Sequence, residues 1–227
     1  MMKTRNYFGW TVLEEDNRYG PALEKNIDYT KESEKELKEI LEHVGQTRCA
    51  LEIGVHYGFG TRLLSENFDH VNTFDFDNDV HQCFKLNMQK FDVNNLTVHP
   101  YGIGANDSFV ATNDVHPRKG RGPLANHVDV KQSSDGKKYK IRALDNIKFE
   151  HVDLMCIDTE GYELFVLKGG EHTIMKHRPV MVIEFHHRNL SQKFFNVSPK
   201  TTEDYIDHLG YRYVKNLNKV DRLYIPK

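Results

Sequence analysis

The chain has 227 residues, and its 31 basic and 33 acidic side chains give a formal charge of −2. This length is enough for one α/β domain with a sizeable core. The near-neutral balance offers no basic surface of the kind that nucleic acid or an anionic membrane attracts. We therefore expect no membrane partner and disfavour nucleic acid as a partner.

Three cysteines, Cys49, Cys83 and Cys156, lie far apart and form no C-x-x-C pair, which is typical of reduced, core-forming thiols. The first thirty residues are charged throughout and lack the apolar region of a signal peptide. No apolar run approaches the roughly 18 to 20 residues that span a bilayer. These features predict a soluble protein of the cytoplasm and leave its oligomeric state open.

Residues 1–29 contain Tyr7, Phe8, Trp10 and Tyr19 without a clear period. We interpret them as an N-terminal extension or lid on a domain at 30–227, with a loosely docked terminus as the alternative. A helix is predicted over residues 33–44, where Ser33 and Glu36 form a capping box and apolar residues recur at helical spacing. Gly45 ends it.

Residues 48–61 read as strand, tight turn and helix, the unit that builds nucleotide sites at the edge of a parallel sheet. A short apolar run contains one acid, Glu52, and is followed by three glycines, Gly54, Gly58 and Gly60. Glycines there let the backbone approach a ligand, because no Cβ intervenes. The start of the following helix supplies free N–H groups.

The spacing of this turn is E-x-G-x-x-x-G-x-G, which differs from the G-x-G-x-x-G of dinucleotide sites. An acid before the first glycine disfavours a pyrophosphate and suits a ligand with an ammonium group, such as S-adenosylmethionine. We therefore predict an S-adenosylmethionine site, with a glycine-rich turn without a ligand as the alternative. The predicted contacts in this turn are Glu52, Gly54, Val55, His56, Gly58 and Gly60.

A second strand over 71–76 leads into a helix with Val80, Phe84, Met88 and Phe91 on one face. An acid at the end of this strand can accept both ribose hydroxyls of a bound nucleoside. We prefer Asp75 for that role over Asp77, which could cap the helix instead. Phe76 and, after a third strand over 96–101, Gly102 complete the predicted cofactor contacts.

Residues 105–137 show no usable period, and loops this long tend to be functional or disordered. They are read as a solvated loop or as a flap over an anionic or polyhydroxyl acceptor. After a short strand at 139–143, strands are predicted at 152–158 and 179–185, with a helix between them that breaks at Gly169-Gly170. A helix over 202–209 and a hairpin of 211–214 with 222–225 close the chain. The count gives a seven-stranded, mostly parallel α/β sheet with one antiparallel strand.

The run Ile157-Asp158-Thr159-Glu160-Gly161-Tyr162-Glu163, with Val166 to Gly170 behind it, resembles the hallmark of FkbM-type methyltransferases. Residues 179–186 resemble that family's next strand, and Arg142-Ala143-Leu144-Asp145 resembles its upstream strand and LD pair. The similarity covers residues 48–187. It implies a class I (Rossmann-like) S-adenosylmethionine-dependent fold and methylation of a hydroxyl on a sugar or secondary metabolite. Where the family has F-E-P, this chain has Phe74-Asp75-Phe76, which keeps a carboxylate for the ribose.

Methyl transfer needs an acceptor oxygen held near attack geometry and a base for its proton. Four candidates fall at the ends of two neighbouring strands, namely Asp158, Glu160, Glu184 and His186. A divalent cation held by Asp158, Glu184 and His186 is a disfavoured alternative. A purely structural role for Glu160 and Glu184 is a second alternative. The predicted function is O-methylation of a glycan or small metabolite. The rivals are a nucleic-acid methyltransferase, an NAD-linked oxidoreductase and a non-catalytic S-adenosylmethionine-binding module.

Overall fold

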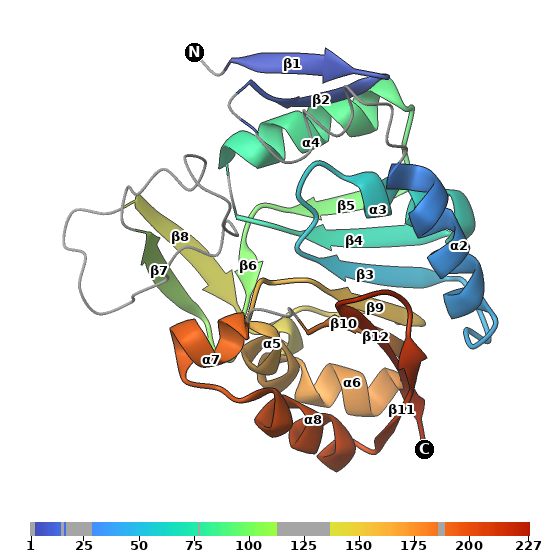
Figure 1. Ribbon diagram of the computed structural model, residues 1–227, viewed down its shortest axis with the longest axis vertical. Coiled ribbons are helices and arrows are strands. Elements are labelled where there is room, and N and C mark those ends of the chain that lie inside the picture. Colours follow the sequence, from blue (N-terminus) through green and yellow to red (C-terminus); the bar gives the residue numbers. More distant parts are fainter. Residues whose placement is uncertain (1–2, 15, 17–28, 77, 113–136, 186–188) are drawn as a thin grey trace.

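The computed structural model of the chain describes residues 3–14, 16, 29–76, 78–112, 137–185 and 189–227. A seven-stranded sheet with the order β11-β12-β10-β9-β3-β4-β5 forms its centre (Figure 1). Strand β12 runs antiparallel to both of its neighbours, whereas β10, β9, β3, β4 and β5 pair in parallel. This arrangement confirms the predicted fold class.

The predicted central strands and the closing hairpin are all present, with ends that shift by at most two residues. The strands of the large sheet are β3 (Cys49–Ile53), β4 (His70–Phe74), β5 (Leu96–His99), β9 (Leu154–Ile157), β10 (Val180–Glu184), β11 (Tyr211–Asn216) and β12 (Asp221–Pro226). Parallel strands buried on both faces read as continuous apolar runs, which is why the sequence pattern located them.

Each face of the large sheet is covered by its own helices (Figure 1). One face packs on α5 (Glu163–Gly169), α6 (Glu171–His177) and α8 (Pro199–His208), through Leu51, Ile53, Met155, Val166 and Ile206 among others. The other packs on α2 (Tyr29–Leu41) and α3 (Phe59–Asn67), through Ala50, Val71, Leu154, Ile40 and Leu64 among others. Residues of one sheet thus alternate between two cores, as the strand period requires.

The N-terminal residues form a hairpin of β1 (Thr4–Tyr7) and β2 (Trp10–Leu13), which lies along α4 (Asn78–Lys90) in Figure 1. Trp10, Val12 and Leu13 are buried in a cluster with Phe84 and Met88 of α4. The Asn87 side chain joins the two elements, since its Oδ1 accepts from the Thr11 N–H at 2.6 Å and its Nδ2 donates to the Thr11 carbonyl at 3.0 Å. The hairpin is therefore packed onto the domain.

Helix α2 begins at Tyr29, so the predicted capping box at Ser33 and Glu36 is wrong. Both residues lie inside the helix, and the Glu36 carboxylate instead accepts a hydrogen bond from Asn218 at 3.0 Å. The S-x-x-E pattern is compatible with a helix interior as well as with its start, and no glycine or proline in residues 29–32 interrupts the helix. It ends at Leu41, ahead of the predicted end at residue 44.

The predicted loop 105–137 is wrong at its start, where β7 (Ser108–Thr112) pairs antiparallel with β8 (Lys137–Arg142). Strand β6 (Gly102–Ile103) joins β8 on its other side, completing a small second sheet. Strand β7 was not predicted because its sequence, SFVAT, shows no clear apolar alternation, and its Phe109 is 63% accessible. The flap prediction for residues 113–136 lies outside the described residues. Helix α7 (Leu190–Phe195) was also not predicted.

No helix in the described ranges combines the length and apolar character that crossing a bilayer requires.

Candidate active site

The turn between β3 and α3 is shaped by glycines that pack against protein atoms. Gly54 has φ +91°, and a Cβ there would lie 1.8 Å from the carbonyl oxygen of Asp158. Gly58 also has φ +91°, and its Cβ would meet the side chains of Met88 at 2.6 Å and Phe84 at 2.9 Å. At both positions, the room that a Cβ would need is therefore taken up by other atoms of the protein. The predicted contact of both glycines with a ligand stays a prediction.

Glu52 lies inside β3 directly beneath the turn. Its carboxyl accepts a hydrogen bond from the Thr61 hydroxyl at 2.5 Å, and a Cβ at Gly60 would lie 2.6 Å from its Oε1. Burial raises the pKa of Glu52 to about 8, and the nearby carboxylates of Asp158 and Asp75 add to this rise, against the Thr61 hydrogen bond. A cation next to Glu52 would restore its charge, as the predicted ammonium contact requires.

Asp75, which follows β4, reaches across to the same turn. Its Oδ2 accepts hydrogen bonds from the backbone N–H groups of Val55 at 3.2 Å and His56 at 3.1 Å. These bonds hold the turn at the carboxyl end of the sheet, which sequence reasoning had not foreseen. The ribose contact of Asp75 stays a prediction, and its rival Asp77 lies outside the described residues.

Phe76 and Gly102 lie together beside Asp75. A Cβ at Gly102 would lie 2.7 Å from the Phe76 ring and 2.7 Å from Ile141 Cδ1. The Phe76 ring also contacts Tyr139 of β8, with centroids 5.0 Å apart. The second, small sheet thus supplies one apolar wall next to the predicted nucleoside position, an arrangement that required the pairing of β6 with β8.

The turn after β9 is held by Glu163, a buried residue that was not among the predicted site residues. Its Oε1 accepts from the Gly161 N–H at 2.8 Å, from the Thr159 N–H at 3.3 Å and from the Thr159 hydroxyl at 3.2 Å. Burial raises its pKa to about 7. Glu160 and Gly161 adopt left-handed φ angles of 55° and 107°, so the turn needs this support. The second acid of E-G-x-E was the available signal for this role.

Three of the four predicted catalytic residues come together at the ends of β9 and β10. Glu184 is buried, whereas Asp158 is exposed. Burial raises the pKa of Glu184 well above its usual value, as do the charges of Asp158 and Glu160 and a hydrogen bond to the Asp158 side chain. Each of these interactions favours the protonated form of Glu184. His186 lies outside the described residues.

The described residues contain no group of three or more histidine, cysteine or acidic side chains arranged to hold a metal ion. A cation site formed by Asp158, Glu184 and His186 stays a prediction, because His186 lies outside the described residues.

Comparison with known proteins identifies the family. The model of the FkbM methyltransferase domain matches residues 70–213, more than half of the chain. The crystal structure of methyltransferase FkbM from Methylobacillus flagellatus KT shares the fold with a TM-score of 0.54 and 20% identity. This match covers 79% of this chain and 43% of that one. The chain thus spans less than half the length of that structure.

A second structure with the same fold is the TehB-like SAM-dependent methyltransferase from Corynebacterium glutamicum. It has a TM-score of 0.51 and 12% identity, and the match covers 92% of this chain and 95% of that one. No curated protein matches the chain.

The acidic groups around the turn suit the charge of S-adenosylmethionine, which carries an ammonium and a sulfonium group. Asp158 and Asp75 each act electrostatically on Glu52, and a cationic ligand would relieve that repulsion. A dinucleotide pyrophosphate would increase it. The chain belongs to the family of FkbM methyltransferase domains and has the class I methyltransferase fold.

Proposed function

We propose that the chain transfers a methyl group from S-adenosylmethionine to a hydroxyl of a sugar, a glycan or a small metabolite. The observation that carries this proposal is the group of carboxyl side chains at the ends of β9 and β10, namely Asp158, Glu160 and Glu184. A neutral hydroxyl needs a group that accepts its proton during the transfer, and a carboxylate at this edge meets that need.

The same acidic edge disfavours a nucleic acid as the acceptor. Nucleic-acid binding depends on lysine and arginine side chains that neutralise phosphates. Here the strand ends present carboxyl groups, and the chain carries a formal charge of −2. We keep nucleic acid as the second acceptor class to be tested, since other methyltransferases act on it with the same fold.

Each acidic residue has a distinct role in the proposed reaction. Bound S-adenosylmethionine supplies an electrophilic methyl group on a sulfonium. Asp158, the exposed member, takes the proton that the acceptor oxygen loses as it bonds to the methyl carbon. Glu184 remains protonated and orients Asp158 through their hydrogen bond. Glu163 is a positioning residue, because it holds the turn that carries Glu160.

A transfer assay with radiolabelled S-adenosylmethionine tests the acceptor class. The acceptors are defined mono- and oligosaccharides, phenols and polyols, with transfer RNA and duplex DNA as the polyanionic alternatives. Label should appear in at least one hydroxyl compound and in neither nucleic acid. Label in RNA or DNA alone would overturn the proposal and support the second acceptor class.

A further inference from the structure

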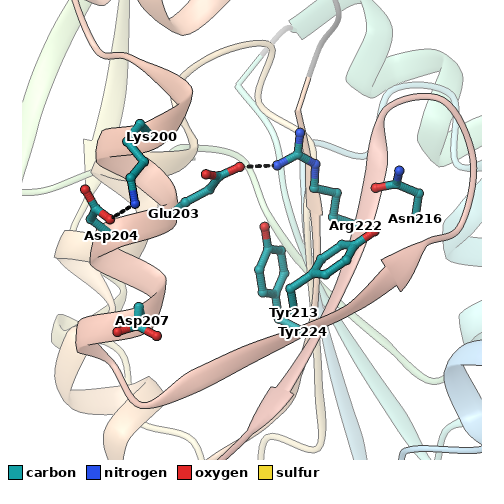
Figure 2. Close-up of a pocket in the computed structure, with 8 residues that line it drawn as sticks. All are labelled: Lys200, Glu203, Asp204, Asp207, Tyr213, Asn216, Arg222 and Tyr224. Carbon is teal, nitrogen blue, oxygen red and sulfur yellow. Dashed lines mark hydrogen bonds and ion pairs between the residues drawn. The ribbon is translucent and has the colours of Figure 1, made fainter.

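A pocket of about 550 Å³ lies between α8 and the β11–β12 hairpin, apart from the predicted cofactor contacts. Figure 2 shows acidic side chains from α8 on one side and two tyrosines with Arg222 on the other. Its lining residues are Lys200, Glu203, Asp204, Asp207, Tyr213, Asn216, Arg222 and Tyr224.

Two tyrosines form the aromatic part of this pocket. Tyr213 of β11 and Tyr224 of β12 are directly paired across the hairpin, with ring centroids 5.9 Å apart and planes at 67°. Tyr224 is buried, whereas Tyr213 is 50% accessible. A half-exposed ring that is held by its neighbour offers a flat apolar surface to a ligand without first having to be ordered.

The charged side chains of the pocket are already compensated by one another. Arg222 pairs with Glu203, and Lys200 pairs with Asp204, as the dashed lines in Figure 2 show. Asp207 pairs with Lys227 at 2.5 Å. A strongly charged ligand would have to break these pairs, whereas a neutral ligand with many hydroxyls can hydrogen-bond to the outward edges of the same groups.

One lining residue of the pocket, Arg222, contacts the residue that follows Glu184. Asp221, the first residue of β12, is paired with Glu184 of β10. The guanidinium of the next residue, Arg222, lies 4.1 Å from the centroid of the Phe185 ring, and Phe185 directly follows Glu184. Through Arg222, the pocket therefore adjoins the end of β10, which carries Glu184.

We propose that this pocket binds a neutral pyranose unit of an oligosaccharide acceptor, while a hydroxyl of an adjoining unit is methylated beside Asp158. The proposal rests on the proposed function for its link to catalysis. The Tyr213 ring stacks against the C–H face of the sugar. The carboxylates of Glu203 and Asp207 accept hydrogen bonds from its hydroxyls.

Sugar binding is tested without the cofactor, so that its result does not depend on catalysis. The probes are the methyl α-pyranosides of glucose, galactose and mannose, each titrated against the full chain by saturation-transfer NMR. Tyr213→Ala is the test variant, because its half-exposed ring can be removed without emptying the core. Phe8→Ala is the matched control, since Phe8 is an equally solvent-facing ring, 66% accessible, on the β1–β2 turn.

At least one glycoside should bind the wild type and Phe8→Ala alike, and its affinity should fall about ten-fold or more in Tyr213→Ala. Calorimetry with S-adenosylhomocysteine should give the same affinity in all three proteins. Absence of glycoside binding to the wild type, or equal binding to Tyr213→Ala, would overturn the pocket assignment. Glycoside binding without any S-adenosylhomocysteine binding would instead leave the pocket in place and refute the proposed function.

Discussion

The Oε1 atom of Glu163 accepts a hydrogen bond from the backbone N–H of Gly161 at 2.8 Å, across the turn that follows β9. Gly161 and its neighbour Glu160 both have left-handed φ angles, a conformation that side-chain-bearing residues seldom adopt. The buried acid therefore maintains the conformation of the turn that carries Glu160.

Two replacements of Glu163 distinguish the effect of its hydrogen bonds from the effect of its charge. Glu163→Gln keeps an oxygen acceptor and should retain most of the stability and turnover. Glu163→Ala leaves the N–H groups of Thr159 and Gly161 without that acceptor and should lower the free energy of unfolding by about 1–3 kcal/mol. Urea unfolding and turnover of both variants measure this. Equal losses in the two variants would contradict a role based on the hydrogen bonds.

Gly58→Ala should destabilise the fold as a whole. The added Cβ would lie 2.6 Å from Met88 and would be carried by a residue with φ +91°, so both packing and backbone are strained. Gly45→Ala is the control, because nothing lies within 4 Å of its Cβ position. Thermal unfolding should show a clear decrease for Gly58→Ala alone. Similar melting temperatures in both variants would refute this account.

Asp75→Ala should weaken S-adenosylhomocysteine binding about ten- to a hundred-fold, since hydrogen bonds to a charged group contribute roughly 1.5–3 kcal/mol. Asp75→Asn keeps an oxygen for the N–H groups of Val55 and His56 and should preserve the turn while losing the charged ribose contact. Asp77→Ala should weaken binding much less. Calorimetry of the three variants measures the affinities. Equal losses in Asp75→Ala and Asp77→Ala would show that the choice of Asp75 was wrong.

Glu52 should make the stability of the ligand-free protein depend on pH. Its pKa is raised from an ordinary value of 4.5 to about 8 in the folded state. The stabilisation is therefore fully present below pH about 4.5 and is lost as the pH rises through about 8, by at most roughly 1.4 kcal/mol per pH unit. Urea unfolding of the wild type and Glu52→Gln between pH 5 and 9 tests this. Parallel pH profiles of the two proteins would contradict it.

Asp158→Asn should lower turnover about 10²–10⁴-fold with little change in cofactor affinity, as expected for loss of a general base. Glu184→Gln keeps a neutral hydrogen-bond donor to Asp158 and should be affected much less. His186→Ala completes the set, and each variant is assayed with and without a chelator. Loss of activity on chelation, restored by magnesium or manganese, would favour the metal alternative. Full activity in all three variants would show that the reacting groups lie elsewhere.

The sequence by itself determined the fold class and placed the predicted site residues at one edge of the sheet. Continuous apolar runs located the buried parallel strands, and the glycine turn and the I-D-x-E-G-x-E run marked where two of them end. These signals are local, because period, turn residues and short motifs depend on neighbours in the chain. Strand β7 and the start of α2 were missed since neither carries such a local signal.

Only the tertiary structure decided what the residues at that edge contact and in which direction their pKa values shift. Gly54 is confined by the Asp158 carbonyl, and Asp75 hydrogen-bonds the turn after β3, although each pair is distant in sequence. The pKa of Glu184 depends on its burial and on the charges that the end of β9 brings beside it. The physical reason is that desolvation and the repulsion between like charges depend on distance in space, which the order of residues along the chain does not specify.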